Sequence, residues 1–109
     1  MMRKLEARDD PPLRDGVMTL IGTSRVKRRP NFKSRLVDGE LVVLDREQGL
    51  IHQLNKTASF IWEQCDGQRT AAEIAGHVCE AFEVEQSTAL NDVLVVLKKL
   101  HDLNLIDKL

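Results

Sequence analysis

The hydrophobic pattern of this sequence changes once, at Asn55, and that change constrains the fold more than any other feature. Over residues 33–54, apolar residues occur in short runs that are separated by turn residues. Over residues 56–103 they recur every three or four positions. The first pattern is typical of strands and the second of helices. Strands that all precede helices in so short a chain predict one small α+β domain.

Three short strands are predicted in the first part of this pattern. Residues 34–37 are the first candidate, and Asp38–Gly39 forms a hairpin turn because glycine adopts a positive φ without steric cost. Residues 40–45 form the second strand, and a turn at residues 46–49 leads to the third, Leu50–Leu54. Together they predict a three-stranded antiparallel sheet.

Three helices are predicted after the strands. Asn55 can cap the first, which ends at Asp66–Gly67, where glycine suits the left-handed C-terminal position. The run Thr70–Glu73 is a capping box that opens the second helix. Ser87 is the predicted N-cap of the third, which runs to about Leu103. The second and third helices resemble a helix-turn-helix, so we expect a winged-helix-like arrangement, the sheet followed by three helices.

Charge divides the chain into two parts. Residues 1–35 carry ten Lys and Arg against four Asp and Glu, a net charge of +6. Residues 36–109 carry six against thirteen, a net charge of −7. Residues 1–30 show no sustained period and are predicted to be a flexible basic arm, whereas residues 31–109 are predicted to be the folded domain.

The sequence contains few residues in patterns that are typical of catalytic sites. Its three histidines lie outside any HExxH pattern, and Cys65 and Cys79 lack the second pair of ligands that a zinc site needs. No glycine-rich phosphate loop occurs, and a chain of 109 residues leaves little room for an enclosed active site. We therefore expect no enzymatic activity, no cofactor and no metal. The sequence contains no secretory signal and no long apolar run, so we expect a cytoplasmic protein with reduced thiols and no membrane contact.

The third predicted helix carries a wide apolar face. Its core-facing stripe consists of Leu90, Val93, Leu94, Leu97 and Leu100, and Ala89, Val96 and Leu103 extend it. The apolar residues then cover about 180° of the helix, with Val96 at the margin of the stripe. This width fits a larger core, a homodimer interface or a groove beside the core, and the sequence leaves these alternatives open.

The third predicted strand, Leu50–Leu54, contains neither Lys nor Pro, residues that commonly protect a sheet edge from further pairing. At a sheet edge, its unpaired N–H and C=O groups would accept another strand. A peptide added there would gain backbone hydrogen bonds from the strand and side-chain contacts from the third helix. The pattern therefore favours peptide binding by strand addition.

The residues also resemble a known family. The matching segments are Asp38–Asp45, Leu54–Ala58, Ile61–Trp62, Asp66–Thr70, Glu73–Ile74, Asp92–Val93, Leu97, Leu100 and Leu105–Ile106. Over residues 30–107 the chain resembles the PqqD-like family, also called the RiPP recognition element. The resemblance implies a non-catalytic peptide chaperone that binds the leader segment of a ribosomally synthesised precursor peptide. Such a protein presents the leader to a modifying enzyme, for example a radical SAM protein or a leader peptidase.

The resemblance further implies that the leader adds to the third strand and lies against the third helix. Carried over to this chain, the candidate peptide-binding residues are Leu50, Ile51, His52, Gln53, Leu54, Asp92, Val93, Val96, Lys99 and Leu100. The family motifs support the scaffold better than they support these ten positions, and nothing in the resemblance extends to residues 1–30.

Two alternatives remain open at the level of sequence. The first is a winged-helix nucleic-acid-binding regulator, in which the basic arm would contact phosphates. The third helix argues against nucleic acid because Lys98 and Lys99 are offset by acidic residues, namely Glu85, Asp92 and Asp102. The second alternative is a homodimer joined through the wide apolar face of the third helix.

Overall fold

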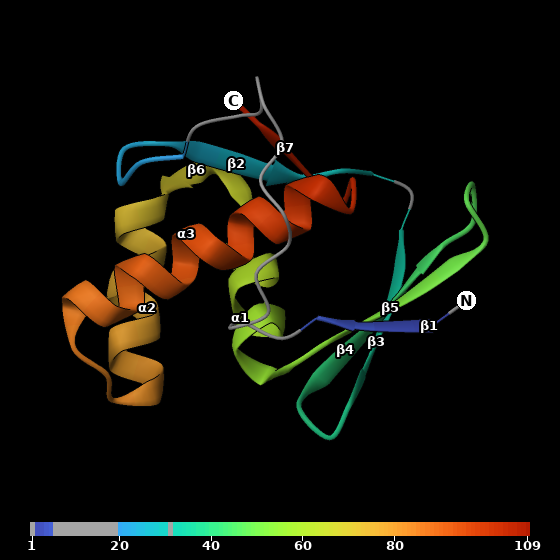
Figure 1. The fold of residues 1–109 in the computed structure, drawn as a ribbon, viewed down its shortest axis with the longest axis horizontal. Helices are drawn as coiled ribbons and strands as arrows, with labels where there is room; N and C mark the ends of the chain where they lie inside the picture. The colour runs from blue at the N-terminus through green and yellow to red at the C-terminus, as the bar shows by residue number, and fades with distance from the viewer. Residues whose placement is uncertain (1, 6–19, 31) are drawn as a thin grey trace.

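Two sheets and three helices form the part of the chain that this computed structural model describes, residues 2–5, 20–30 and 32–109 (Figure 1). In chain order the elements are β1 (Met2–Leu5), β2 (Arg25–Arg28), β3 (Lys33–Val37), β4 (Glu40–Asp45), β5 (Leu50–Leu54), α1 (Lys56–Gln64), β6 (Asp66–Thr70), α2 (Ala71–Phe82), α3 (Gln86–Asp102) and β7 (Ile106–Lys108). The α+β class predicted from the sequence is confirmed, with β3, β4 and β5 preceding the three helices.

The larger sheet has the strand order β1-β5-β4-β3. Its β3–β4 and β4–β5 pairs are antiparallel, so the predicted three-stranded arrangement is confirmed. The turn between β3 and β4 holds Asp38 and Gly39 at φ values of 51° and 80°, the left-handed pair that a tight hairpin requires. Side chains of β4 alternate, and Leu41, Val43 and Asp45 are its buried residues.

The smaller sheet has the order β6-β2-β7, and both pairs are antiparallel. The sequence predicts residues 1–30 as a flexible arm, but Arg25–Arg28 forms the central strand of this sheet, and Val26 is fully buried. One apolar residue among charged neighbours produces no recognisable period. The strand forms through its pairing with β6 and β7, which the local sequence does not predict. Residues 1 and 6–19 of the predicted arm lie outside the described residues.

Side-chain caps start the first two helices as predicted. The Asn55 side chain accepts a hydrogen bond from the Ala58 N–H at 2.8 Å, which opens α1. Thr70 and Glu73 make both bonds of the capping box that opens α2. These caps place the helix starts within a residue of where the sequence predicts them.

The third helix and the segment before α2 differ from the prediction. The predicted cap at Ser87 is wrong, because the Glu85 carbonyl already accepts the first helical hydrogen bond, from the Ala89 N–H at 2.8 Å. Ser87 therefore lies inside α3. The first helix ends at Gln64, just before the predicted stop at Asp66–Gly67, and Asp66–Thr70 forms β6, which pairs with β2. Gly67 has the predicted left-handed conformation, with a φ of 83°.

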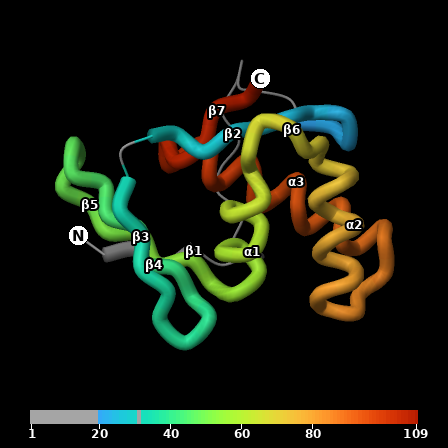
Figure 2. The backbone as a smooth tube through the Cα atoms, turned by 180° about the vertical axis from the view of Figure 1, so that it is seen from behind, coloured from blue at the N-terminus to red at the C-terminus, as the bar shows by residue number. Residues whose placement is uncertain are grey.

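α1 lies between the larger sheet and the other two helices, and both views of the backbone show this central position (Figures 1 and 2). The buried Ser59 hydroxyl joins α1 to the sheet, since it accepts from the Leu41 N–H at 2.8 Å and donates to the Leu54 carbonyl at 2.9 Å. One turn further along α1, the Trp62 indole N–H donates to the Leu105 carbonyl at 3.2 Å. Among the described residues, no helix combines the length and the apolar character needed to span a membrane.

Candidate functional site

The predicted peptide-binding strand, β5, is the last strand of the antiparallel meander, but its outer edge is already paired. β1 lies parallel to it, with Met2–Leu5 aligned in continuous register with Ile51–Leu54 (Figure 1). The sequence predicts an open edge here, and the structure corrects that expectation. The reason is that the unpaired N–H and C=O groups of an edge strand accept a segment from anywhere in the chain.

The side chains of β5 divide between the two faces of the larger sheet. His52 and Leu54 are buried, at 1% and 0% exposure, and they align with buried residues of β4. Ile51 and Gln53 are half-buried on the opposite face, and Leu50 is half-buried at the start of the strand. The Gln53 side-chain amide donates to the Glu40 carboxylate at 2.8 Å across the sheet. The backbone edge and the Ile51–Gln53 face are therefore the parts of β5 that a further strand can contact.

The predicted residues of α3 are much less accessible than the sequence suggests. Val93, Val96 and Leu100 are fully buried, Lys99 is 4% exposed, and only Asp92 of this predicted set is half-buried. Val96, expected at the margin of the apolar face, belongs to the core. Ala89 and Leu97 of the same face are also fully buried, whereas Leu90, Leu94 and Leu103 are half-buried and pack against the core.

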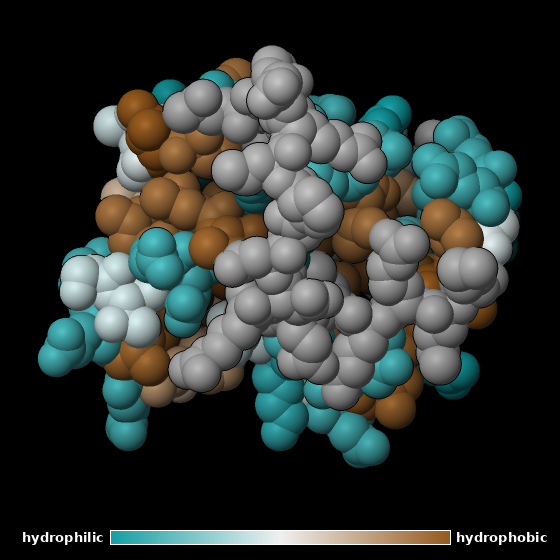
Figure 3. Space-filling view, viewed as in Figure 1, coloured by the Kyte–Doolittle hydropathy of each residue, from teal (hydrophilic) through white to brown (hydrophobic). Residues whose placement is uncertain are grey.

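Packing in the core thus accounts for the fully buried part of the wide apolar face of α3, whereas its half-buried residues remain partly accessible. Apolar side chains also gather over this helix on the face that Figure 3 shows. α1 contacts both β5 and α3, so the strand and the helix of the predicted site share one supporting element. The assignment of the ten predicted residues to a peptide site stays a prediction.

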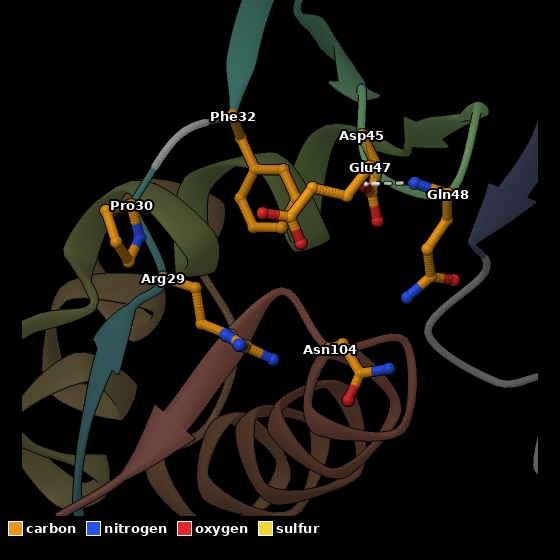
Figure 4. A pocket seen from close by; sticks show the side chains of 7 residues that line it. All are labelled: Arg29, Pro30, Phe32, Asp45, Glu47, Gln48 and Asn104. Atoms are coloured by element: carbon orange, nitrogen blue, oxygen red, sulfur yellow. Dashed lines mark hydrogen bonds between the residues drawn. The ribbon is translucent and has the colours of Figure 1, made fainter.

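A hollow opens between the two sheets, close to the start of β5 (Figure 4). The β2–β3 connection, the β4–β5 turn and Asn104 line it. Its charged residues are Asp45, Glu47 and Arg29. The Asp45 carboxylate accepts from the Gln48 N–H at 3.1 Å, and the Arg29 guanidinium forms an ion pair with Asp107 at 3.8 Å. This polar lining offers a place for solvent or a polar group beside the strand, without a pair of groups arranged for acid–base catalysis.

The buried thiol of Cys65 is unreactive, and the described side chains form no metal centre. Burial raises the pKa of the Cys65 thiol to about 12, so the thiol stays protonated and is a poor nucleophile. Cys65 and Cys79 are both free, as the sequence predicts. No group of three or more His, Cys, Asp or Glu side chains within residues 2–5, 20–30 and 32–109 could hold a metal ion.

One feature of the site escapes prediction from the sequence altogether, namely the occupation of β5 by β1. Met2–Leu5 has apolar residues only at its two ends, and no turn residue or period marks it as a strand. The distance in sequence between β1 and β5 removes any local signal of their pairing. The absence of Lys and Pro from β5 is the one hint, because it indicates that this edge is built to be paired.

Comparisons with known proteins agree with this geometry. The sequence model of one protein family, described as "Coenzyme PQQ synthesis protein D (PqqD)", matches residues 40–106. Among similar solved structures, "TbiB1 in Complex with the TbiA(beta) Leader Peptide" is 25% identical, with a TM-score of 0.66, and the match covers 74% of this chain and 94% of that one. "Lasso peptide synthetase B1 complexed with the leader peptide" is also 25% identical, with a TM-score of 0.66, covering 76% of this chain and 98% of that one.

A third solved structure is similar in fold. It is the solution structure of a PqqD truncation of Methylobacterium extorquens PqqCD, described as a stand-alone RiPP recognition element. It is 18% identical, with a TM-score of 0.68, and the match covers 82% of this chain and 95% of that one. None of the curated proteins compared matches this chain.

Proposed function

This chain belongs to the PqqD family, and from that premise we propose that it is a non-catalytic recognition element for the leader segment of a ribosomally synthesised precursor peptide. The leader adds as a strand to the outer edge of β5. The observation that carries the proposal is that this edge accepts a strand, since β1 pairs with it over four consecutive residues. Two similar structures, each 25% identical to this chain, are described as complexes with leader peptides.

The physical basis of this recognition is the backbone of β5 together with its half-buried face. Backbone N–H and C=O groups of an edge strand provide affinity for any extended peptide, and the neighbouring side chains provide selectivity. Ile51 and Gln53 flank the edge on one face of the sheet and are accessible to a paired strand. The buried side chains of His52 and Leu54 anchor β5 to the interior of the domain.

The partner in this function is a modifying enzyme, such as a radical SAM protein or a leader peptidase, to which the chain delivers the bound leader. We place the encounter in the cytoplasm, where precursor peptides are synthesised. Burial keeps the Cys65 thiol protonated, and no group of His, Cys, Asp or Glu side chains among the described residues could hold a metal ion, which supports assigning the chemistry to the partner. Co-elution of chain, leader and enzyme in size-exclusion chromatography, with light scattering, tests this assembly and reveals whether the chain is a homodimer.

Strand addition can be tested with modified peptides that leave the protein unchanged. Successive N–H groups of a strand point in opposite directions, so only alternate residues of a bound leader donate to β5. Two versions of the leader encoded beside this gene are synthesised, one N-methylated at odd positions and one at even positions of the pairing segment. Isothermal titration should show that one pattern abolishes binding and that the other is tolerated.

The outcomes of this experiment separate the proposal from its competitors. Equal effects of the two methylation patterns would show that the leader does not bind as a strand. No binding of any neighbouring leader at about 100 μM, a free energy weaker than about −5.5 kcal/mol, would overturn leader recognition itself. A salt-sensitive shift of duplex DNA in its place would favour the nucleic-acid alternative.

A further inference from the structure

The edge of β5 that the proposed function assigns to a leader peptide is occupied in this structure by the chain's own β1. Met2 aligns with Ile51, and the pairing continues without a shift to Leu5 and Leu54. Each N–H and C=O group on that edge serves one partner strand at a time. A leader and β1 therefore cannot pair with the same residues of β5 simultaneously.

We propose that β1 is an intramolecular competitor, which covers the peptide-binding edge until a leader displaces it. The inference rests on the proposed function, because it names what must leave the site before a peptide enters. The occupant is a defined segment of this chain, Met2–Leu5, and the site is the outer edge of β5. The measured free energy of leader binding is then the difference between two terms, the pairing of the leader with β5 and the pairing of β1 with β5.

The charge of β1 itself favours its association with the rest of the chain. Arg3 and Lys4 give Met2–Leu5 two positive charges, and residues 36–109, which include β5 and all three helices, carry a net charge of −7. The remaining excess of Lys and Arg in residues 1–35 lies in residues 25–35, outside this segment. The attraction of β1 is therefore a modest one, and salt weakens it.

Tethering makes so short a strand an effective occupant. A segment in the same chain is present at its site at an effective concentration of about a millimolar, whatever the protein concentration. Four paired residues form a weak strand, which tethering makes competitive without making it permanent. When a fraction of the molecules has the edge covered, the apparent Kd for the leader rises by the inverse of the fraction that is open.

The covered edge also has a benefit for the free protein. An unprotected edge strand without Lys or Pro is a template for pairing between molecules, which leads to aggregation. β5 has this composition, and β1 supplies the pairing that its own residues do not prevent. The edge can therefore accept a leader that displaces β1, while in the free protein β1 keeps it from pairing with other copies of the chain.

The competition is tested with two matched double variants of the full chain. Consecutive residues of a parallel strand direct their N–H groups to opposite sides, so one of Arg3 and Lys4 donates toward β5. Replacing both (Arg3→Pro and Lys4→Pro) removes that donor whichever residue carries it. The control (Arg3→Ala and Lys4→Ala) removes the same two charges and leaves the backbone able to pair.

The first readout needs no leader. Hydrogen exchange, followed residue by residue by NMR, measures the protection of the β5 amides in each variant. We expect the β5 amides that face β1 to exchange faster in the double-proline variant than in the double-alanine variant. A synthetic peptide of residues 1–10 of this chain, added to the double-proline variant at millimolar concentration, should restore part of that protection. Equal protection in the two variants would overturn the proposal.

The second readout is the affinity for the leader peptide encoded beside this gene, measured by isothermal titration. The double-proline variant should bind this leader ~3- to 10-fold more tightly than the double-alanine variant, because the edge is open. Equal affinity, or weaker binding by the double-proline variant, would show that β1 does not compete with the leader. If no variant binds any leader, the proposed function fails and the competition fails with it, while hydrogen exchange still decides whether β1 covers the edge.

Discussion

We predict that the Ser59 hydroxyl stabilises the part of the fold that carries the site, although the sequence does not single this residue out. Its hydroxyl is buried, at 2% exposure, and it makes two hydrogen bonds to the larger sheet. It accepts from the Leu41 N–H at 2.8 Å and donates to the Leu54 carbonyl at 2.9 Å. One side chain of α1 therefore holds both β4 and β5, the strand that carries the peptide-binding edge.

Ser59→Ala leaves one N–H and one C=O group in the interior without this partner. Each buried polar group that loses its hydrogen bond costs about 1–3 kcal/mol, so the two groups together predict a loss of about 2–6 kcal/mol in the free energy of unfolding. For a domain of this size, such a loss lowers the Tm by roughly 4–8 °C per kcal/mol. Urea unfolding followed by circular dichroism and by the fluorescence of Trp62, the single tryptophan, measures it.

Ser87→Ala is the matched control for this prediction. It makes the same chemical change in an exposed residue inside α3 that forms no helix cap. Alanine is the better helix former, so the control should be neutral or stabilising by a few tenths of a kcal/mol. If Ser59→Ala changes the stability by less than about 0.5 kcal/mol, the two hydrogen bonds do not stabilise the fold and the reasoning is refuted.

Three further predictions concern the core, the thiols and acid. Val96→Asp should unfold the domain, because it places a charge where exposure is 0%, at a cost of about 4 kcal/mol or more; a folded variant by circular dichroism would contradict the burial. Cys65, with a pKa raised to about 12 by burial, should resist thiol reagents at pH 8 until urea unfolds the chain, and rapid labelling in buffer would refute this. Backbone hydrogen bonds lower the pKa of Asp66 and Glu73. The two ionised carboxylates should therefore stabilise the folded state fully above about pH 5, and this contribution should disappear as the pH falls below about 4. The urea midpoint of the double variant Asp66→Asn, Glu73→Gln should accordingly depend less on pH in that range.

Local chemistry explains why much of the fold can be predicted from the sequence. The turn at Asp38–Gly39 and the capping box at Thr70–Glu73 are decided by residues a few positions apart, so the sequence displays them in full. The cap at Glu85 is missed because its side chain makes no capping hydrogen bond, so no capping side chain in the sequence marks the start of α3. Val26 is missed for a different reason, since a single buried residue in a short strand leaves no period.

The candidate site was only partly predictable because two of its properties are not local. The apolar width of α3 correctly indicates extensive burial, but the sequence cannot distinguish a larger core from a groove, and the structure places Val93, Val96 and Leu100 in the core. The pairing of β5 is indicated by the lack of Lys and Pro, whereas the identity of its partner is not. The backbone groups at a strand edge can pair with any extended segment, so the residues of β5 do not determine which segment pairs with it.

This generic chemistry also limits what gives a leader its advantage over β1. Both form the same backbone hydrogen bonds with Ile51–Leu54, so these bonds cannot discriminate between them. Tethering favours β1, and a leader must compensate by pairing over a longer stretch or by contacting side chains beyond the edge. Leu50, half-buried at the start of β5 and outside the register of β1, is the β5 residue that a longer partner reaches. Selectivity for the leader therefore depends on side chains that flank the paired segment. To displace β1, a peptide must make contacts in addition to the backbone hydrogen bonds that both strands form.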